Sequence, residues 1–130
     1  MADEEILVVE DNEKNMKLIR VVLESSGYRT LEASTGREAV DLASEHRPAL
    51  VLMDIRLADM DGLEALKRLR EDADTASIPV LALTAQAMKG DRERFLEAGF
   101  DGYLAKPVDI DELIAIVREY CQPGDREASS

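Results

Sequence analysis

Five side chains suited to metal or phosphoryl chemistry each stand directly after a short apolar run: Glu10, Asp11, Asp54, Thr84 and Lys106. Carboxylates gathered near one point raise each other's pKa unless a cation joins them. Because the chain has one histidine and one cysteine, the ligands it offers are mainly oxygen atoms. Oxygen ligands suit a hard divalent ion such as Mg²⁺, so the sequence predicts a Mg²⁺ site if these residues meet.

The same residues suit phosphoryl transfer to a carboxylate. Asp54 is the expected nucleophile for an aspartyl phosphate, because it emerges in the middle of this set of residues. Thr84 can donate a hydrogen bond to a phosphoryl oxygen, and Lys106 can hold either a carboxylate or that oxygen. Each residue alone would be ordinary in a loop. The prediction comes from their joint placement after four different apolar runs.

Short apolar runs alternate with helical patterns along the chain. Strands are expected in five places: 6–9, 28–33, 49–53, 80–83 and 103–105. The second is more polar and fits a sheet edge. Helices are expected to open near five residues: Asn12, Thr35, Gly62, Asp91 and Asp109. This alternation predicts an α/β fold, a doubly wound (βα)5 arrangement with a parallel five-stranded sheet and helices on both faces. Such sheets bind ligands at the carboxyl ends of their strands, where the five residues stand.

Length and charge restrict the other function classes. The 130 residues fit one domain, expected over 4–121, followed by a disordered tail over 122–130. With 28 acidic and 16 basic residues the net charge is −12, which argues against nucleic acid and an anionic membrane as partners. The N-terminus has no secretory signal pattern, and the lone Cys121 cannot form an internal disulfide. A cytoplasmic location follows as the expectation.

Other common ligand-binding motifs are incomplete or absent in the sequence. Aligning Gly62 with the invariant glycine of an EF-hand loop places Leu57 and Arg68 where acidic ligands are needed. The chain has neither a phosphate-binding loop ending in Gly-Lys-Ser/Thr nor a dinucleotide-binding glycine pattern. The only histidine, His46, is expected at the surface. A Mg²⁺-dependent hydrolase acting through an aspartyl phosphate remains an alternative, although no segment is long enough to cover a substrate.

The chain resembles a response-regulator receiver domain over about residues 5–120. The resemblance is carried by four segments: Val8-Val9-Glu10-Asp11-Asn12, Leu52-Met53-Asp54-Ile55, Leu83-Thr84-Ala85 and Tyr103-Leu104-Ala105-Lys106-Pro107. It implies the strand order 2-1-3-4-5 of flavodoxin-like and CheY-like folds. It also implies a signalling protein of a two-component phosphorelay, which catalyses only its own phosphorylation and dephosphorylation.

The resemblance further implies a role for each residue. Asp54 would accept a phosphoryl group from a sensor histidine kinase or a histidine phosphotransferase. Mg²⁺ would be held by Asp11, Asp54 and the backbone carbonyl of Arg56, with Glu10 acting through water. Thr84 and Tyr103 would be switch residues, and Lys106 would precede a cis peptide bond to Pro107. The switch would reshape a protein-binding face made by the fourth helix, the fifth strand and the fifth helix, with the first helix as another docking surface.

Two finer alternatives concern the size of the protein. The segments 12–18 and 84–91 are most similar to those of a single-domain regulator of cell division. Receivers fused to hybrid histidine kinases carry similar segments, so a receiver excised from such a kinase is the alternative. Met1 and the short tail favour a free-standing regulator.

Overall fold

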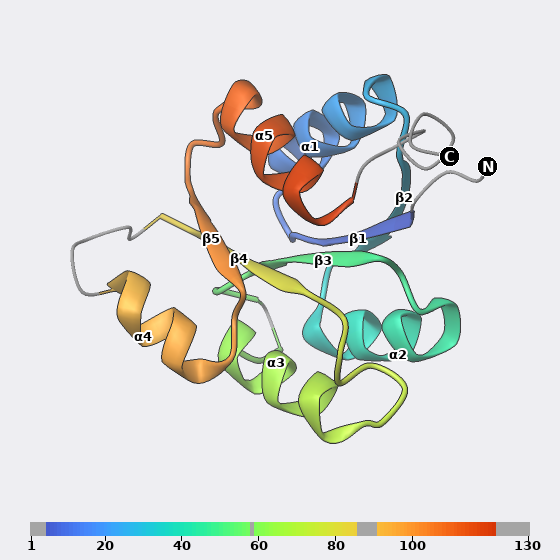
Figure 1. Cartoon of the computed structure of the whole chain (residues 1–130), viewed down its shortest axis with the longest axis vertical. Coiled ribbons are helices and arrows are strands. Elements are labelled where there is room, and N and C mark those ends of the chain that lie inside the picture. Colours follow the sequence, from blue (N-terminus) through green and yellow to red (C-terminus); the bar gives the residue numbers. More distant parts are fainter. Residues whose placement is uncertain (1–4, 58, 86–90, 122–130) are drawn as a thin grey trace.

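The computed structural model describes residues 5–57, 59–85 and 91–121, with the side chains of residues 91 and 92 left aside. A five-stranded parallel sheet of order β2-β1-β3-β4-β5 forms its centre (Figure 1). The strands are β1 (Glu5–Val9), β2 (Arg29–Ala33), β3 (Leu50–Asp54), β4 (Val80–Thr84) and β5 (Gly102–Ala105). The helices are α1 (Glu13–Ser25), α2 (Gly36–His46), α3 (Gly62–Glu71), α4 (Asp91–Ala98) and α5 (Ile110–Tyr120). The predicted fold class and strand order are confirmed.

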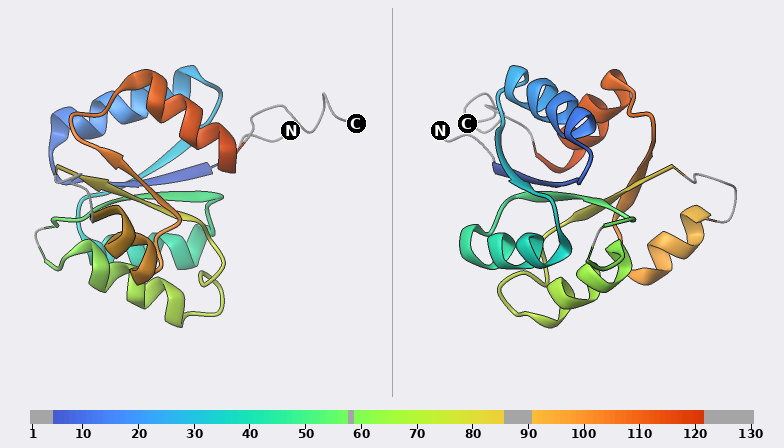
Figure 2. Two further views of the ribbon diagram at one scale, coloured as in Figure 1. Left: turned by 60° about the vertical axis from the view of Figure 1, so that its left-hand side comes forward. Right: turned by 180° about the vertical axis from the view of Figure 1, so that it is seen from behind.

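Helices cover both faces of the sheet, which explains the unbroken apolar runs. α1 and α5 lie on one face, and α2, α3 and α4 lie on the other (Figures 1 and 2). In β1, Ile6 and Val8 pack toward the α1 and α5 side, whereas Leu7 and Val9 pack toward the opposite core. All of these side chains are fully buried. A strand covered on both faces cannot alternate polar and apolar residues, and the sequence shows none of that alternation in β1, β3 or β4.

The predicted helix starts are confirmed at α1, α2, α3 and α5. Each has an N-cap side chain that accepts a hydrogen bond from the amide three residues later, at Asn12, Thr35, Asp61 and Asp109. In the first turn of α2, the carboxylate of Glu38 accepts hydrogen bonds from the backbone N–H and the hydroxyl of Ser34.

One predicted core position is wrong. The spacing of Leu113, Val117 and Tyr120 in the sequence predicts that Tyr120 lies on the inner face of α5, but it is 36% exposed. Its hydroxyl donates a 3.1 Å hydrogen bond to the carbonyl of Asp101 at the start of the β5 edge. The polar end of the ring thus stays near solvent, whereas Leu113 and Val117 of the same helix are fully buried and Ile116 is half-buried.

Arg70 at the end of α3 joins segments that the sequence does not place together. Its guanidinium donates to the carbonyls of Ala76, Ile78 and Gly99 at 3.1, 2.7 and 3.0 Å. It also forms a 3.1 Å ion pair with Asp101, whose carboxylate accepts a hydrogen bond from the N–H of Val80. The start of β4 and the turn between α4 and β5 are therefore fastened to α3.

Some expectations fall outside the part of the chain that is described. These are the boundary at residue 4, the tail 122–130 and most of the segment 84–91. Among the described residues, no helix has the length and apolar character needed to span a bilayer.

Candidate functional site

The parallel topology brings the predicted residues together at the carboxyl edge of the sheet. Glu10 and Asp54, which are 2% and 5% exposed, stand at the ends of the neighbouring strands β1 and β3. Asp11 is exposed beside them, and oxygen atoms of the three carboxylates lie within 4.8 Å of one another. Thr84 is buried at the end of β4. The five residues that the sequence singles out therefore share one site, although their individual roles stay predictions.

Lys106 forms the electrostatic centre of this cluster. Its Nζ lies 2.8 Å from Oε1 of Glu10 and 2.9 Å from Oδ2 of Asp54. Burial, the largest influence, acts to lower the pKa of Lys106, but the hydrogen bonds and charges of the two carboxylates together raise it. The N–H of Lys106 donates to the carbonyl of Thr84 at 2.8 Å, which holds its backbone in place. The next peptide bond, to Pro107, is cis as expected.

The carboxyl group of Glu10 is buried, and burial disfavours its ionised form. Burial is the largest influence on its carboxyl and raises its pKa above the ordinary glutamate value, and the charge of Asp54 acts in the same direction. Hydrogen bonds from Lys106 and from the backbone of Asn12 lower this pKa without offsetting the burial. The ionised form of Glu10 is therefore stabilised less than it would be in water.

The cluster fits a divalent cation. Oε1 of Glu10 is buried and lies 2.8 Å from Nζ of Lys106, an ammonium group that Glu10 shares with Asp54. Asp11 adds a third carboxylate beside them. The pocket beside them, about 290 Å³, is lined by Asp11, Asp54, Arg56, Thr84 and Lys106 among others. Three carboxylates within reach of one point supply the oxygen ligands that Mg²⁺ prefers.

Replacing Glu10 with glutamine is expected to raise the free energy of unfolding at about pH 7 when a chelator removes divalent cations. A carboxyl whose pKa is raised by folding binds protons more tightly in the folded state. Its stabilising contribution is present below the ordinary value of 4.5 and is lost as pH rises through the folded value. The variant and the parent should therefore be equally stable below that value and diverge above it, as measured by urea unfolding across pH.

Saturating Mg²⁺ supplies the control for the Glu10→Gln comparison. A cation that binds only the folded state stabilises it, and the parent has one more carboxylate facing the ion. We therefore expect the advantage of the variant to shrink or reverse when Mg²⁺ is added. An advantage of the same size with and without Mg²⁺ would contradict a metal site beside Glu10.

The loop after β3 is closed tightly against Asp54. A Cβ atom at Gly62 would lie 2.6 Å from the carbonyl oxygen of Asp54 and 2.9 Å from Cα of Ile55. The N–H of Gly62 donates to the carbonyl of Ile55 at 2.6 Å, and Arg56 and Asp61 form an antiparallel bridge across the loop. The N–H of Arg56 in turn donates to Oδ1 of Asp54 at 3.0 Å. The loop thus orients the carboxylate that the sequence proposes as nucleophile.

Asp59 is a site-loop residue that sequence analysis missed. Its carboxylate accepts hydrogen bonds from the N–H groups of Gly36 and Arg37, at 2.8 and 3.0 Å, in the first turn of α2. The hydrogen bond from Gly36 is the main reason that the pKa of Asp59 lies below its usual value. An acidic residue in a loop gives no signal of which distant helix it will cap, so only the tertiary structure reveals this contact.

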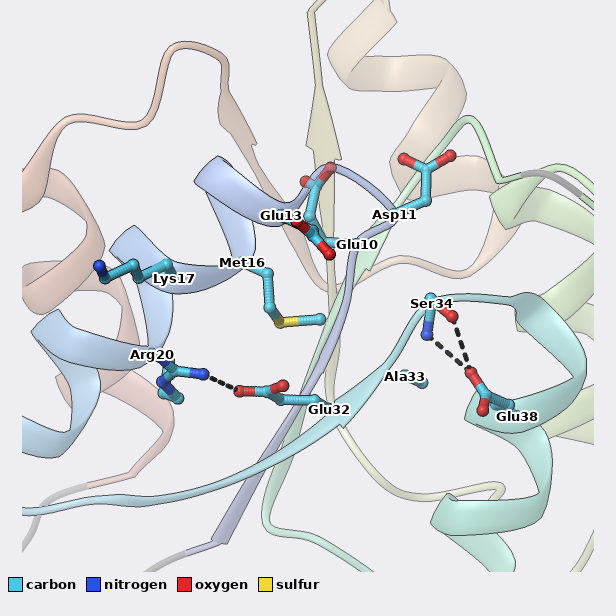
Figure 3. A pocket seen from close by; sticks show the side chains of 10 residues that line it. All are labelled: Glu10, Asp11, Glu13, Met16, Lys17, Arg20, Glu32, Ala33, Ser34 and Glu38. Carbon is cyan, nitrogen blue, oxygen red and sulfur yellow. Dashed lines mark hydrogen bonds and ion pairs between the residues drawn. The ribbon is translucent and has the colours of Figure 1, made fainter.

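A second hollow borders the acidic cluster on the other side. It has a volume of about 510 Å³ and lies between α1, the end of β2 and the start of α2 (Figure 3). Glu10 and Asp11 line both this hollow and the pocket of Asp54. An ion pair of 2.8 Å between Arg20 and Glu32, two of its lining residues, joins α1 to the edge strand β2. The acidic cluster therefore borders two hollows, one on each side.

Tyr103 and the residues expected at the surface lie outside the acidic cluster. Tyr103 is half-buried in β5 and packs against the core beneath α2, α3 and α4. Exposed apolar side chains lie on α1 at Leu18 and Val21, and on α4 at Leu96. His46 is exposed at the end of α2, as expected.

A doubly wound sheet with carboxylates and a lysine at this edge defines the receiver class of signalling domains. Residues 6–118 match the family model of the response regulator receiver domain. The chain therefore belongs to the response regulator receiver family.

Comparison with individual proteins places the chain more finely within the family. It is 49% identical over 115 residues to the polar-differentiation response regulator DivK of Brucella anthropi, covering 88% of this chain and 94% of that protein. The DivK-like character of the segments 12–18 and 84–91 agrees with this similarity.

Two solved structures are also similar. The receiver domain of the sensor histidine kinase PA1611 from Pseudomonas aeruginosa, with a magnesium ion coordinated in the active site cleft, is 42% identical. It has a TM-score of 0.84 and covers 92% of this chain and 98% of that one. The receiver domain of Ssk1 from Saccharomyces cerevisiae, solved with the histidine phosphotransfer protein Ypd1, is 29% identical with a TM-score of 0.83, covering 92% and 89%.

Proposed function

We propose that this protein accepts a phosphoryl group on Asp54 in a Mg²⁺-dependent reaction and thereby switches its interactions with other proteins. The observation that carries the proposal is the contact of Lys106 with Asp54 and Glu10, beside a third carboxylate at Asp11. The donor would be a histidine kinase or a histidine phosphotransferase. The solved complex of Ypd1 with the Ssk1 receiver supports that class of partner.

Mg²⁺ would be held by Asp11, Asp54 and the backbone carbonyl of Arg56, with Glu10 acting through water. The ion would neutralise charge on the phosphoryl oxygens during transfer. The magnesium ion in the PA1611 receiver supports this assignment. The three carboxylates, whose oxygen atoms lie within 4.8 Å of one another, support it from this chain's own residues.

The residues of the chain would then divide the remaining work. A carboxylate oxygen of Asp54 forms a bond to phosphorus while the bond from phosphorus to the donor's imidazole nitrogen breaks, and the electron pair of that bond leaves with the imidazole. Lys106, already 2.9 Å from Oδ2 of Asp54, neutralises charge beside the acceptor. Thr84 donates a hydrogen bond to the new phosphoryl group, and Tyr103 moves into the space that Thr84 leaves.

The output would be a change of protein binding. The switch residues Thr84 and Tyr103 lie in β4 and β5, so we propose that the face of α4, β5 and α5 binds the downstream target. The exposed Leu18 and Val21 support α1 as the alternative surface for that target. We place the reaction in the cytoplasm, a reducing compartment suited to the lone Cys121. The domain would extend over 4–121, with its only catalysis directed at its own phosphoryl group.

Incubation with acetyl phosphate and Mg²⁺ tests the proposed function. We expect one phosphoryl group per chain, stable in acid and labile in base, with no uptake when a chelator removes Mg²⁺. Intact-mass spectrometry follows the uptake, and released phosphate measures turnover. Sustained turnover of small phosphoesters would favour the Mg²⁺-dependent hydrolase instead, and a lack of uptake in the presence of Mg²⁺ would contradict both functions.

A further inference from the structure

The first turn of α2 is docked directly on the loop that follows Asp54. Both oxygen atoms of Asp59 are used, one by the N–H of Gly36 and the other by the N–H of Arg37. Beside this contact, the side chain of Met60 fills the space that a Cβ of Gly36 would occupy, with its Cγ 2.5 Å from that position. A polar and a steric contact therefore fix the loop against one helix end.

The loop after Asp54 is restrained on two sides, by the end of β3 and by α2. On the side of the sheet, Gly62 presses against Asp54 and the bridge between Arg56 and Asp61 closes the loop. On the outer side, the contacts of Asp59 with α2 restrain it. A carboxylate at a helix N-terminus accepts hydrogen bonds from N–H groups that have no partner within the helix and is favoured by the helix dipole. The position of Arg56 is thus supported through α2.

We propose that Asp59 is a positioning residue for the Mg²⁺ site, which acts by holding the loop that carries Arg56 against the N-terminus of α2. This inference rests on the proposed Mg²⁺-dependent function. Asp59 itself does not contact the ion. Groups that orient metal-binding elements without touching the metal change its affinity, because a ligand held loosely must be ordered when the ion binds.

The coupling works in both directions. If α2 favours the loop arrangement that binds Mg²⁺, then bound Mg²⁺ must favour the docked arrangement of α2 to the same degree. The amides of Gly36 and Arg37 therefore report on the metal site. Through this contact, occupancy of the site also reaches the helix that borders the second hollow near Ser34 and Glu38.

The test compares Asp59→Ala with Thr35→Ala in the full chain. Thr35 caps the same helix end by accepting a 3.1 Å hydrogen bond from the N–H of Glu38, but it does not belong to the loop. Isothermal titration calorimetry with MgCl₂ should show affinity weakened about tenfold by Asp59→Ala and less than about twofold by Thr35→Ala. Asp59→Asn, which keeps one carbonyl acceptor and loses the charge, should fall between them.

A second measurement does not depend on affinity. In the parent protein, the amide NMR signals of Gly36 and Arg37 should shift as Mg²⁺ is added, and in Asp59→Ala they should not respond. Equal weakening by Asp59→Ala and Thr35→Ala would mean that only the stability of α2 matters, which would overturn the inference. Unchanged affinity in Asp59→Ala would also overturn it. Absence of Mg²⁺ binding in the parent would instead show that the proposed function has failed.

Discussion

Replacing Asp54 with asparagine is expected to reduce phosphoryl uptake from acetyl phosphate by at least roughly a thousandfold. The amide has no anionic oxygen to attack phosphorus, and no described side chain is better placed to replace it. Glu10 is buried with its Oε2 accepting a hydrogen bond from Asn12, and Asp11 is exposed at the rim. Intact-mass spectrometry after incubation with acetyl phosphate and Mg²⁺ measures the loss.

Two comparison variants separate the acceptor from its surroundings. Asp61→Asn removes a carboxylate that caps α3 through the N–H of Glu64, so phosphoryl uptake should continue. Asp11→Asn keeps the acceptor but removes a proposed metal ligand, so uptake should slow and require more Mg²⁺. If Asp54→Asn retained uptake at the rate of the parent, Asp54 would not be the acceptor, and peptide mapping of the phosphoryl group would identify the residue that is.

Replacing Gly62 with alanine is expected to lower the free energy of unfolding by about 2 kcal/mol and to impair the site at the same time. Alanine normally improves a helix, and Gly62 is the first residue of α3. Here its Cβ would collide with the backbone of Asp54 and Ile55, at 2.6 and 2.9 Å, and backbone at the end of a buried strand cannot move aside cheaply. Urea unfolding measures the stability, and the rate of phosphoryl uptake reports on Asp54.

Gly102→Ala serves as the control for this clash. A Cβ at Gly102 would lie 3.1 Å from Cδ2 of Leu81, the end of a flexible side chain that can shift. We expect a loss of less than about 1 kcal/mol and an unchanged rate of uptake. A stable Gly62→Ala variant with full uptake would show that the loop after β3 tolerates displacement, contrary to the tight closure that its backbone contacts indicate.

The sequence predicts the sheet and the cluster because both depend on repeated, simple constraints. A strand covered on both faces must be apolar throughout, as β3 and β4 are, and parallel strands must deliver their following residues to one edge. Glu10, Asp54 and Lys106 could therefore be brought together without coordinates. The contact distances could not be predicted, because the side chain of Lys106 must reach back across the ends of β4 and β3 to meet Glu10.

Contacts between loops and helix ends were beyond sequence analysis. Asp59 lies in a loop and Gly36 in a helix more than twenty positions away, and no periodicity connects them. Arg70 likewise lies at the end of α3 and binds three carbonyl groups in other segments, which no pattern in the sequence indicates. Tyr120 fits the apolar period of α5, but its hydroxyl favours a polar partner near solvent. In each case a tertiary hydrogen bond decides the position.

The direction in which the chain runs has a practical use for building sensors. β1 starts, and α5 ends, at the edge of the sheet opposite the acidic cluster, where the hydroxyl of Tyr28 donates to the carbonyl of Cys121 (Figures 1 and 2). A fluorescent label or an affinity handle joined before Glu5 or after Cys121 would thus be attached on the side of the domain opposite Asp54. Immobilised in this way, the protein would keep Asp54 facing outward, toward whatever donor is passed over the surface.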